Sequence, residues 1–385
     1  MSNIKMLVVD FDRSSVGAAL LAAVNEANGR PTNPTYEICS SALAGGADLC
    51  AKPEQIRDAV FAGKYWGAVY AAAGVTAQYQ ATIAGTNTTP YNASSAYVLY
   101  GNSARYAAFY PAVVLSNLQA IVEASSAIFM QQTSAPLLAT LSSNGTVLSA
   151  EKIQALLTPL GSTYTDTSYG SFTFGDRTVF NTLLIVVVVL CQFFFLMSLN
   201  GLSLAFKRFD NVSAKDYFKW RVPISISWAL FGGLCITAWQ LTFKEEYPIN
   251  ARLVFSLWTL YWVFAMIVFD VLDIVTAFVP PQFVPFCMFT WMITNVTSAG
   301  APLELSNVFY RVSYFFPAHA MWLAEQHIWS QGGAYRLSIS LPILAAWLVV
   351  AKTGTIFTLA PRRKLAALAK KGGPPGGPPG GPRRG

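Results

Sequence analysis

The sequence NTLLIVVVVLCQFFFLMSLNGLSLAF, residues 181–206, decides the fold class of this chain. Leu183–Leu190 is an unbroken apolar run, Phe193–Met197 continues it, and the whole stretch holds no charged residue. A helix of about 20 apolar residues crosses the hydrocarbon core of a bilayer, which is about 30 Å thick. The stretch therefore predicts a transmembrane helix.

Similar apolar runs recur towards the carboxyl terminus, and they are Val222–Phe243, Leu253–Phe278, Phe283–Ser298 and Leu337–Leu359. The composition of the 385 residues agrees, since 54% are hydrophobic and only 12% are charged. A soluble domain has roughly 25% charged residues, because its surface needs them. We expect an all-α transmembrane bundle of about five helices over residues 178–360, in contact with the lipid bilayer.

The first part of the chain, residues 1–177, has the pattern of an α/β domain, because strand and helix signals alternate in it. Strands are expected at Ile4–Phe11, Tyr36–Cys39, Tyr65–Ala71 and Ala96–Tyr100. Helices are expected from Ser14 or Ser15 to Asn28 and at Glu54–Ala62, Pro111–Gln132 and Ala150–Leu157, with a polar linker at Gly161–Asp176. We interpret Asp10 and Asp12 as turn caps, with metal ligation or acid–base chemistry as the alternative.

Basic residues give the chain an orientation. They gather between the first two runs, at Lys207, Arg208, Lys215, Lys219 and Arg221, and after the last run, at Arg362, Arg363, Lys364, Lys370 and Lys371. Cytoplasmic loops are rich in Lys and Arg, and five spans place both regions on that side. This topology explains the net charge of +7 without a nucleic acid partner.

Residues 1–177 are therefore expected outside the cell, as an extracytoplasmic domain of a multi-pass protein of the plasma membrane. Such a domain crosses the membrane behind a signal peptide or an earlier span, so we expect a segment before Met1. Residues 361–385 form a basic, Gly/Pro-rich stretch, which predicts a disordered cytosolic tail.

The outward domain carries candidate modification sites. Asn87, Asn92 and Asn144 each begin an Asn-x-Ser/Thr sequon, which predicts glycosylation. Cys39 and Cys50 are the only cysteines outside the apolar runs. They either form a disulfide, as an oxidising compartment permits, or are two small buried residues.

Polar residues within the apolar runs are the candidate functional residues, because they are costly in lipid and usually face the interior of the bundle. Asp270 and Asp273 lie one helical turn apart. They either couple transport to a proton or cation gradient or are ionised carboxylates near water at the cytosolic end. The remaining candidates either line a path or hydrogen-bond between helices, and they are Gln192, Asn200, Gln240 and Asn295.

The sequence contains none of the common catalytic motifs. The chain has no G-x-x-x-x-G-K-[ST], G-x-S-x-G or H-E-x-x-H motif and no paired C-x-x-C. His319, His327 and Glu325 could hold a metal, but we favour an amphipathic helix in the membrane interface, anchored by Trp322 and Trp329. We therefore expect no enzyme, no catalytic residues, no metal and no cofactor.

Four short segments resemble the fungal nitrosoguanidine-resistance membrane proteins, which are similar to phage-infection-type proteins with permease domains like those of ABC exporters. They are Met6–Asp12 with Gly17, Tyr65–Tyr70, Tyr97–Arg105 and Tyr314–Pro317. The resemblance covers most of residues 4–360 and brings no catalytic residues. Members of that family carry a span before the outward domain.

The resemblance implies a permease-like protein that exports amphipathic or toxic compounds, confers resistance to them, or organises membrane lipids. Its substrate would be lipid-like or small and amphipathic, and a homo-oligomer is compatible with this function. The alternative is a non-transporting adaptor or regulator whose outward domain binds a partner.

Overall fold

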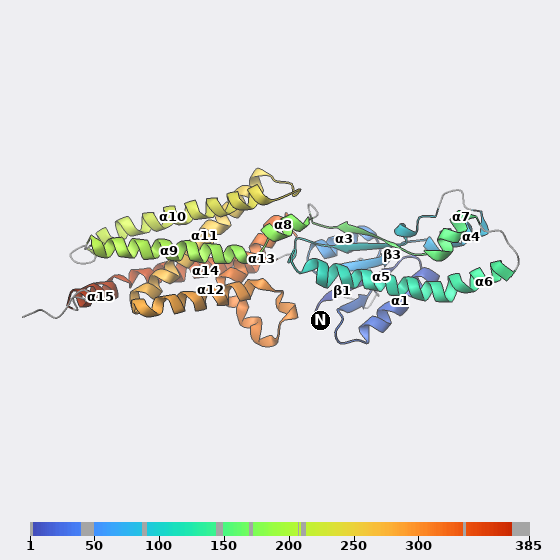
Figure 1. Cartoon of the computed structure of the whole chain (residues 1–385), viewed down its shortest axis with the longest axis horizontal. Helices are drawn as coiled ribbons and strands as arrows, with labels where there is room; N and C mark the ends of the chain where they lie inside the picture. The colour runs from blue at the N-terminus through green and yellow to red at the C-terminus, as the bar shows by residue number, and fades with distance from the viewer. Residues whose placement is uncertain are drawn as a thin grey trace, which may run out of the picture.

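The computed structural model describes residues 3–39, 50–86, 91–143, 149–168, 172–206, 208, 213–333 and 336–371. The molecule is elongated, with a layered α/β part at one end and a bundle of long helices at the other (Figure 1). The long helices run along the long axis of the molecule, so the sheet and the bundle lie end to end.

The α/β part is built on a five-stranded mixed sheet in the order β2-β1-β3-β4-β5. β1 is parallel to β2 and β3, β4 is antiparallel to β3, and β5 is parallel to β4. Its elements are β1 Lys5–Asp10, α1 Ser15–Asn28, β2 Thr35–Ile38, α3 Pro53–Phe61, β3 Gly67–Ala71, α4 Val75–Ala84, η1 Ala93–Ser95, β4 Tyr97–Gly101, η2 Pro111–Leu115, α5 Ser116–Phe129, η3 Met130–Ser134, α6 Ala135–Ser143, α7 Ala150–Leu157 and β5 Ser162–Asp166.

Both faces of the sheet are covered, because alternate side chains of a strand point to opposite faces. Met6 and Val8 of β1 belong to the large core that includes α1 and α5, whereas Leu7 and Val9 belong to a smaller core with α3. The Cys39–Cys50 disulfide packs against this smaller core, and its Cα atoms are 6.1 Å apart. The sheet is therefore buried on both faces, as the apolar β1 sequence indicates.

The four predicted strands occur as β1 to β4, but the prediction of a linker over Gly161–Asp176 is wrong. Ser162–Asp166 forms β5, which pairs with β4 at the edge of the sheet. Its side chains alternate between partly buried and exposed, and it contains no large aliphatic residue. Hydrophobic periodicity therefore does not reveal this strand.

The carboxylates at the end of β1 hold turns, as interpreted from the sequence. Asp10 Oδ1 accepts a hydrogen bond from the backbone N–H of Arg13 at 2.9 Å. Asp12 accepts from the N–H and hydroxyl of Thr76 at 3.0 and 2.6 Å, at the start of α4. A Cβ at Gly17 of α1 would lie 2.0 Å from Asp10 Oδ1, so the Asp10 carboxylate fits against α1 only because this residue has no side chain.

The bundle follows the sheet in the chain. Its elements are α8 Phe174–Val179, α9 Leu183–Ala205, α10 Ala214–Phe243, α11 Ala251–Phe278, η4 Pro281–Phe283, α12 Val284–Gly300, η5 Leu303–Leu305, η6 Val308–Phe315, α13 Pro317–Trp329, α14 Leu337–Ile356 and α15 Leu359–Lys371.

Five helical stretches among the described residues are long and apolar enough to cross a membrane, and they are Pro111–Leu141, Phe174–Ala205, Ala214–Phe243, Ala251–Phe278 and Leu337–Lys364. The last four correspond to predicted spans. The predicted span Phe283–Ser298 does not reach this length, since α12 has 17 residues. At about 1.5 Å per residue, α12 is about 26 Å long, less than the hydrocarbon core of about 30 Å.

The stretch Pro111–Leu141 is also long and apolar enough to cross a membrane, but it packs along the sheet. Leu118 and Phe129 of this stretch are 0% and 1% exposed, in the core that includes β1. The sequence predicts a helix here, and the structure extends it past Gln132 through a π-helical turn at Met130–Ser134. We therefore assign this helix to the α/β part.

The bundle exposes large apolar side chains on its outer surface. Phe194 on α9, Phe231 on α10, Phe286 on α12 and Val349 on α14 are 57–70% exposed. A soluble monomer rarely exposes apolar surface on several neighbouring elements. These helices therefore face lipid, and the chain is a multi-pass membrane protein.

The expectation of an amphipathic interface helix around His319–Trp329 is wrong, because α13 is buried. Trp322 and Trp329 are 5% and 2% exposed. Trp322 packs against Tyr106 of the α/β part, with ring centroids 6.1 Å apart. Side chains from both halves of the chain cover α13. The hydrophobic pattern of the α13 sequence alone does not reveal this burial.

Candidate functional site

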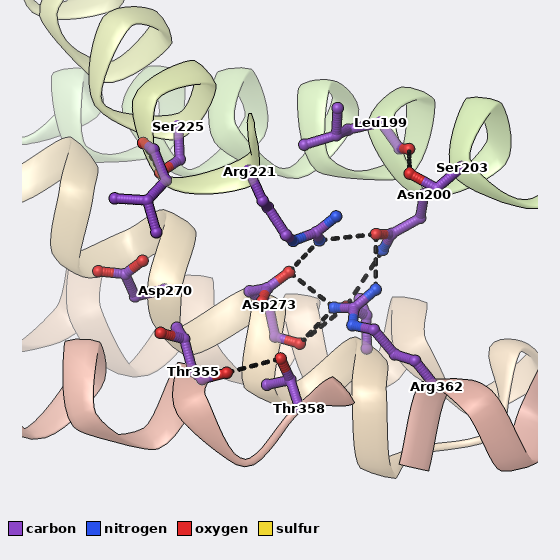
Figure 2. Close-up of polar contacts among 12 residues, drawn as sticks. Leu199, Asn200, Ser203, Arg221, Ser225, Asp270, Asp273, Thr355, Thr358 and Arg362 are labelled. Atoms are coloured by element: carbon purple, nitrogen blue, oxygen red, sulfur yellow. Dashed lines mark hydrogen bonds and ion pairs between the residues drawn. The ribbon is translucent and has the colours of Figure 1, made fainter. Parts of the chain in front are cut away.

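A buried ion-pair network joins four helices (Figure 2). It lies at the end of the bundle away from the sheet, where α15 is found (Figure 1). The Asp273 carboxylate on α11 pairs with Arg221 on α10 and with Arg362 on α15, the latter at 2.6 Å. Asn200 Oδ1 on α9 accepts hydrogen bonds from both guanidinium groups, at 2.8 and 2.6 Å. These four side chains fix the relative positions of the helices.

Asp270 lies one turn along α11, outside this network, and pairs with Lys352 on α14 at 3.0 Å. Both aspartate side chains are 2% exposed, whereas the Lys352 side chain is 29% exposed. Both aspartates were predicted from the sequence as candidate functional residues, whereas Lys352 was not. The sequence feature that could have identified Lys352 is its position inside an apolar run, because a charged side chain there is costly in lipid unless it has a partner.

From the sequence, Arg221 and Arg362 served only as markers of topology. The prediction of a disordered tail from residue 361 is wrong over its first part, because Leu359–Lys371 forms α15 and Arg362 is buried in this network. Their shared contact with Asp273 places the two basic regions at the same end of the bundle. This is the relative placement that the predicted topology requires.

The other predicted polar residues lie at three separate places. Gln192 is buried on α9, near Gly232 of α10. Asn295 Oδ1 on α12 accepts from the N–H of Ala318 at 3.3 Å and so caps the start of α13. Gln240 lies at the end of α10 that adjoins the sheet. The six candidates therefore do not form one hydrogen-bonded cluster among the described residues.

Gln240 belongs to a second buried polar cluster. Glu325 Oε1 on α13 accepts hydrogen bonds from Gln240 Nε2 at 2.9 Å and from Tyr261 Oη at 2.6 Å. Glu325 is 1% exposed. From the sequence, Glu325 was a candidate only as a metal ligand together with His319 and His327. No group of three or more side chains that could hold a metal ion occurs among the described residues.

Charged residues also join the α/β part to the bundle. Glu304 lies between Arg105, at 3.5 Å, and Arg336, at 3.1 Å. Arg105 also stacks over the ring of Trp66 with its Cζ 3.6 Å from the centroid. Burial lowers the pKa of Arg105 to about 10, so the residue remains charged at neutral pH. The junction is thus held by charge as well as by Trp322.

An apolar groove of about 830 Å³ opens between α11, α13 and α14. Its walls are Leu253, Phe255, Ser256, Thr259, Leu260 and Val263 on α11, and Leu337, Leu341, Leu344, Ala345 and Leu348 on α14. Ala324, His327 and Ile328 of α13 complete it. From Arg252 to Val263, α11 rises about 16 Å, which is about half the bilayer core.

The groove has polar groups at the end nearest the sheet. They are Asn250, Arg252, His327 and Gln331. Burial lowers the pKa of His327, so this imidazole is neutral at neutral pH. The charge at this end is therefore that of Arg252, which is exposed. The groove combines an apolar body with a cationic mouth.

The predicted modification sites are only partly within the described residues. Asn92 is exposed, and its Oδ1 accepts from the N–H of Ser94 at 3.1 Å. Asn87 and Asn144 lie outside the described residues. Glycosylation of the three sequons stays a prediction.

Comparison with known proteins places the chain in a family. Residues 1–353 match the profile of DUF3533, described as a protein of unknown function. The chain belongs to this family. The DUF3533 match runs from β1 into α14, so it includes both the sheet and the groove. No solved structure matches the chain.

Proposed function

We propose that this DUF3533 member is a permease-like protein that accepts an amphipathic, lipid-like molecule in the groove between α11, α13 and α14. Export of such compounds, resistance to them, or organisation of membrane lipids would follow from this binding. In this proposal the α/β part is extracytoplasmic, at the plasma membrane, and the basic ends of α10 and α15 face the cytosol.

The groove is the observation that carries the proposal. Its volume of about 830 Å³ lies within the range of about 300–1,000 Å³ that is usual for small-molecule sites. Its apolar body suits a hydrocarbon chain, and Arg252 at its mouth suits an anionic head group. The resemblance to the fungal nitrosoguanidine-resistance proteins favours the same class of compound.

Two adjacent alanines on α14 provide a matched test. Both Ala345 and Ala346 are exposed, but only Ala345 lines the groove. We expect Ala345→Trp to fill the groove and to weaken binding of a nitrobenzoxadiazole-labelled fatty acid about tenfold or more, a loss of about 1.4 kcal/mol. The measurement uses protein in phosphatidylcholine nanodiscs. Ala346→Trp should leave the affinity within about twofold, and equal affinities for the two variants would refute the proposal.

The non-transporting adaptor is the second candidate, and the ion pairs favour it. Asp270 and Asp273 both have cationic partners, so neither is a free carboxylate for coupling to a gradient. Efflux of the labelled fatty acid from proteoliposomes separates the candidates. Efflux that Ala345→Trp abolishes supports the permease, whereas binding without efflux supports the adaptor.

A further inference from the structure

Helix α13 presents three different faces to its surroundings, because residues three or four positions apart share a face of a helix. The residues that line a small cavity at the junction with the α/β part are His319, Leu323 and Gln326. Those that line the groove are Ala324, His327 and Ile328. On the third face, Glu325 contacts α10 and α11. A change in the packing of this third face would therefore reach both the groove and the junction.

The hydrogen bonds of Glu325 are unequally distributed. Oε1 accepts from both Gln240 and Tyr261, whereas Oε2 has no hydrogen bond of ordinary geometry within the described part of the chain. The indole of Trp329 on the same helix also faces the carboxyl group. Gln240, Tyr261 and Trp329 are all uncharged at neutral pH, so the groups facing Glu325 supply no counter-charge.

A buried carboxylate without a counter-charge is costly, because removing a charge from water costs several kcal/mol. The buried Asp273 meets this cost with two arginines, but Glu325 has no such partner among the described residues. Burial raises the pKa of Glu325 to about 7, and the hydrogen bonds from Tyr261 and Gln240 oppose the shift. A proton on Oε2 removes the charge and leaves both hydrogen bonds to Oε1 intact.

We propose that Glu325 is a proton-binding site at the contact of α10, α11 and α13, and that its protonation controls the packing of α13 and thereby the groove. Protonation converts the carboxylate to a neutral carboxylic acid and needs no co-reactant. Loss of the proton puts an uncompensated charge between three helices, which favours movement of α13 or entry of water. The control of the groove rests on the proposed function, but the protonation does not.

Infrared spectroscopy of the full chain in nanodiscs tests the protonation directly. The carbonyl stretch of a neutral carboxylic acid should disappear as the pH rises through neutrality in the wild type, and Glu325→Gln should lack this component. Glu304→Gln is the matched control and should keep it, because Glu304 lies outside this cluster, in ion pairs with Arg105 and Arg336. Tyr261→Phe removes a donor to the carboxylate, so it should move the transition to higher pH. An unchanged titration in Glu325→Gln overturns the site, and so does a transition that follows sodium concentration instead of pH.

The link to the groove has its own readout. Affinity for the labelled fatty acid should change about tenfold between pH 5.5 and 8.5 in the wild type, an estimate from about 1.4 kcal/mol of coupling, and should stay constant in Glu325→Gln. If Ala345→Trp leaves binding intact while the infrared titration occurs, the proposed function fails and the proton site stands. If binding is sensitive to Ala345→Trp but equally pH-dependent in Glu325→Gln, the control by Glu325 is refuted.

Discussion

Replacing Asp273 by asparagine should destabilise the bundle far more than the same replacement at Asp270. Asp273→Asn keeps the size of the side chain and removes its charge. It removes the carboxylate that pairs with the guanidinium groups of Arg221 and Arg362, each 4% exposed. Asp270→Asn leaves only Lys352, whose side chain is 29% exposed and can turn towards water.

The size of the difference follows from the burial of the partners. Breaking a buried ion pair by removing one partner costs about 3–5 kcal/mol, because the remaining charge stays buried. We therefore expect Asp273→Asn to lower the free energy of unfolding by about 3 kcal/mol. For Asp270→Asn we expect a loss of about 1 kcal/mol, which is the upper end of the range for exposed ion pairs. With about 2–4 °C per kcal/mol, Asp273→Asn lowers the Tm by roughly 6–12 °C.

Thermal unfolding in detergent micelles, followed by circular dichroism, provides the measurement. A third variant tests the reasoning further, since replacing a whole buried ion cluster by apolar residues is often neutral or stabilising. Arg221→Met, Arg362→Met and Asp273→Leu together should therefore recover most of the Tm lost in Asp273→Asn. Equal Tm values for Asp273→Asn and Asp270→Asn would refute the argument from burial.

Three more expectations concern stability. Burial raises the pKa of Glu325 from 4.5 to about 7. The contribution of Glu325 to the free energy of unfolding is therefore complete below pH 4.5. It falls by about 3 kcal/mol as the pH rises to 7, at about 1.4 kcal/mol per pKa unit. Denaturation of the wild type and Glu325→Gln at several pH values should show this difference, and parallel curves would contradict it. A Cβ at Gly233 would lie 2.9 Å from the backbone nitrogen of Trp262, so Gly233→Ala should cost about 1–3 kcal/mol by overpacking α10 against α11. Gly201→Ala, with no atom within 4 Å, is the control and should not lower the Tm. Reduction of the Cys39–Cys50 bridge, which spans 11 positions, should lower the stability of the α/β part by about 3 kcal/mol, and an unchanged protease sensitivity would refute that value.

The sequence by itself determined which half of the chain folds in water and which half lies in lipid. Runs such as Leu183–Leu190 are too long and too apolar for a soluble surface, and the continuous apolar run Met6–Val9 is typical of a strand buried on both faces. These signals are local, because they depend only on the period and length of apolar stretches. They predicted four strands of the sheet and the helices α9, α10, α11 and α14.

Tertiary structure decided everything that depends on distant partners. β5 is a strand because β4 offers an open edge, and α13 is buried because Tyr106 and other side chains cover it. Asp273 could be recognised as costly in lipid, but its arginines are 52 and 89 positions away in the chain. Only folding brings such groups together, since a buried charge requires a partner in space and not a neighbour in sequence.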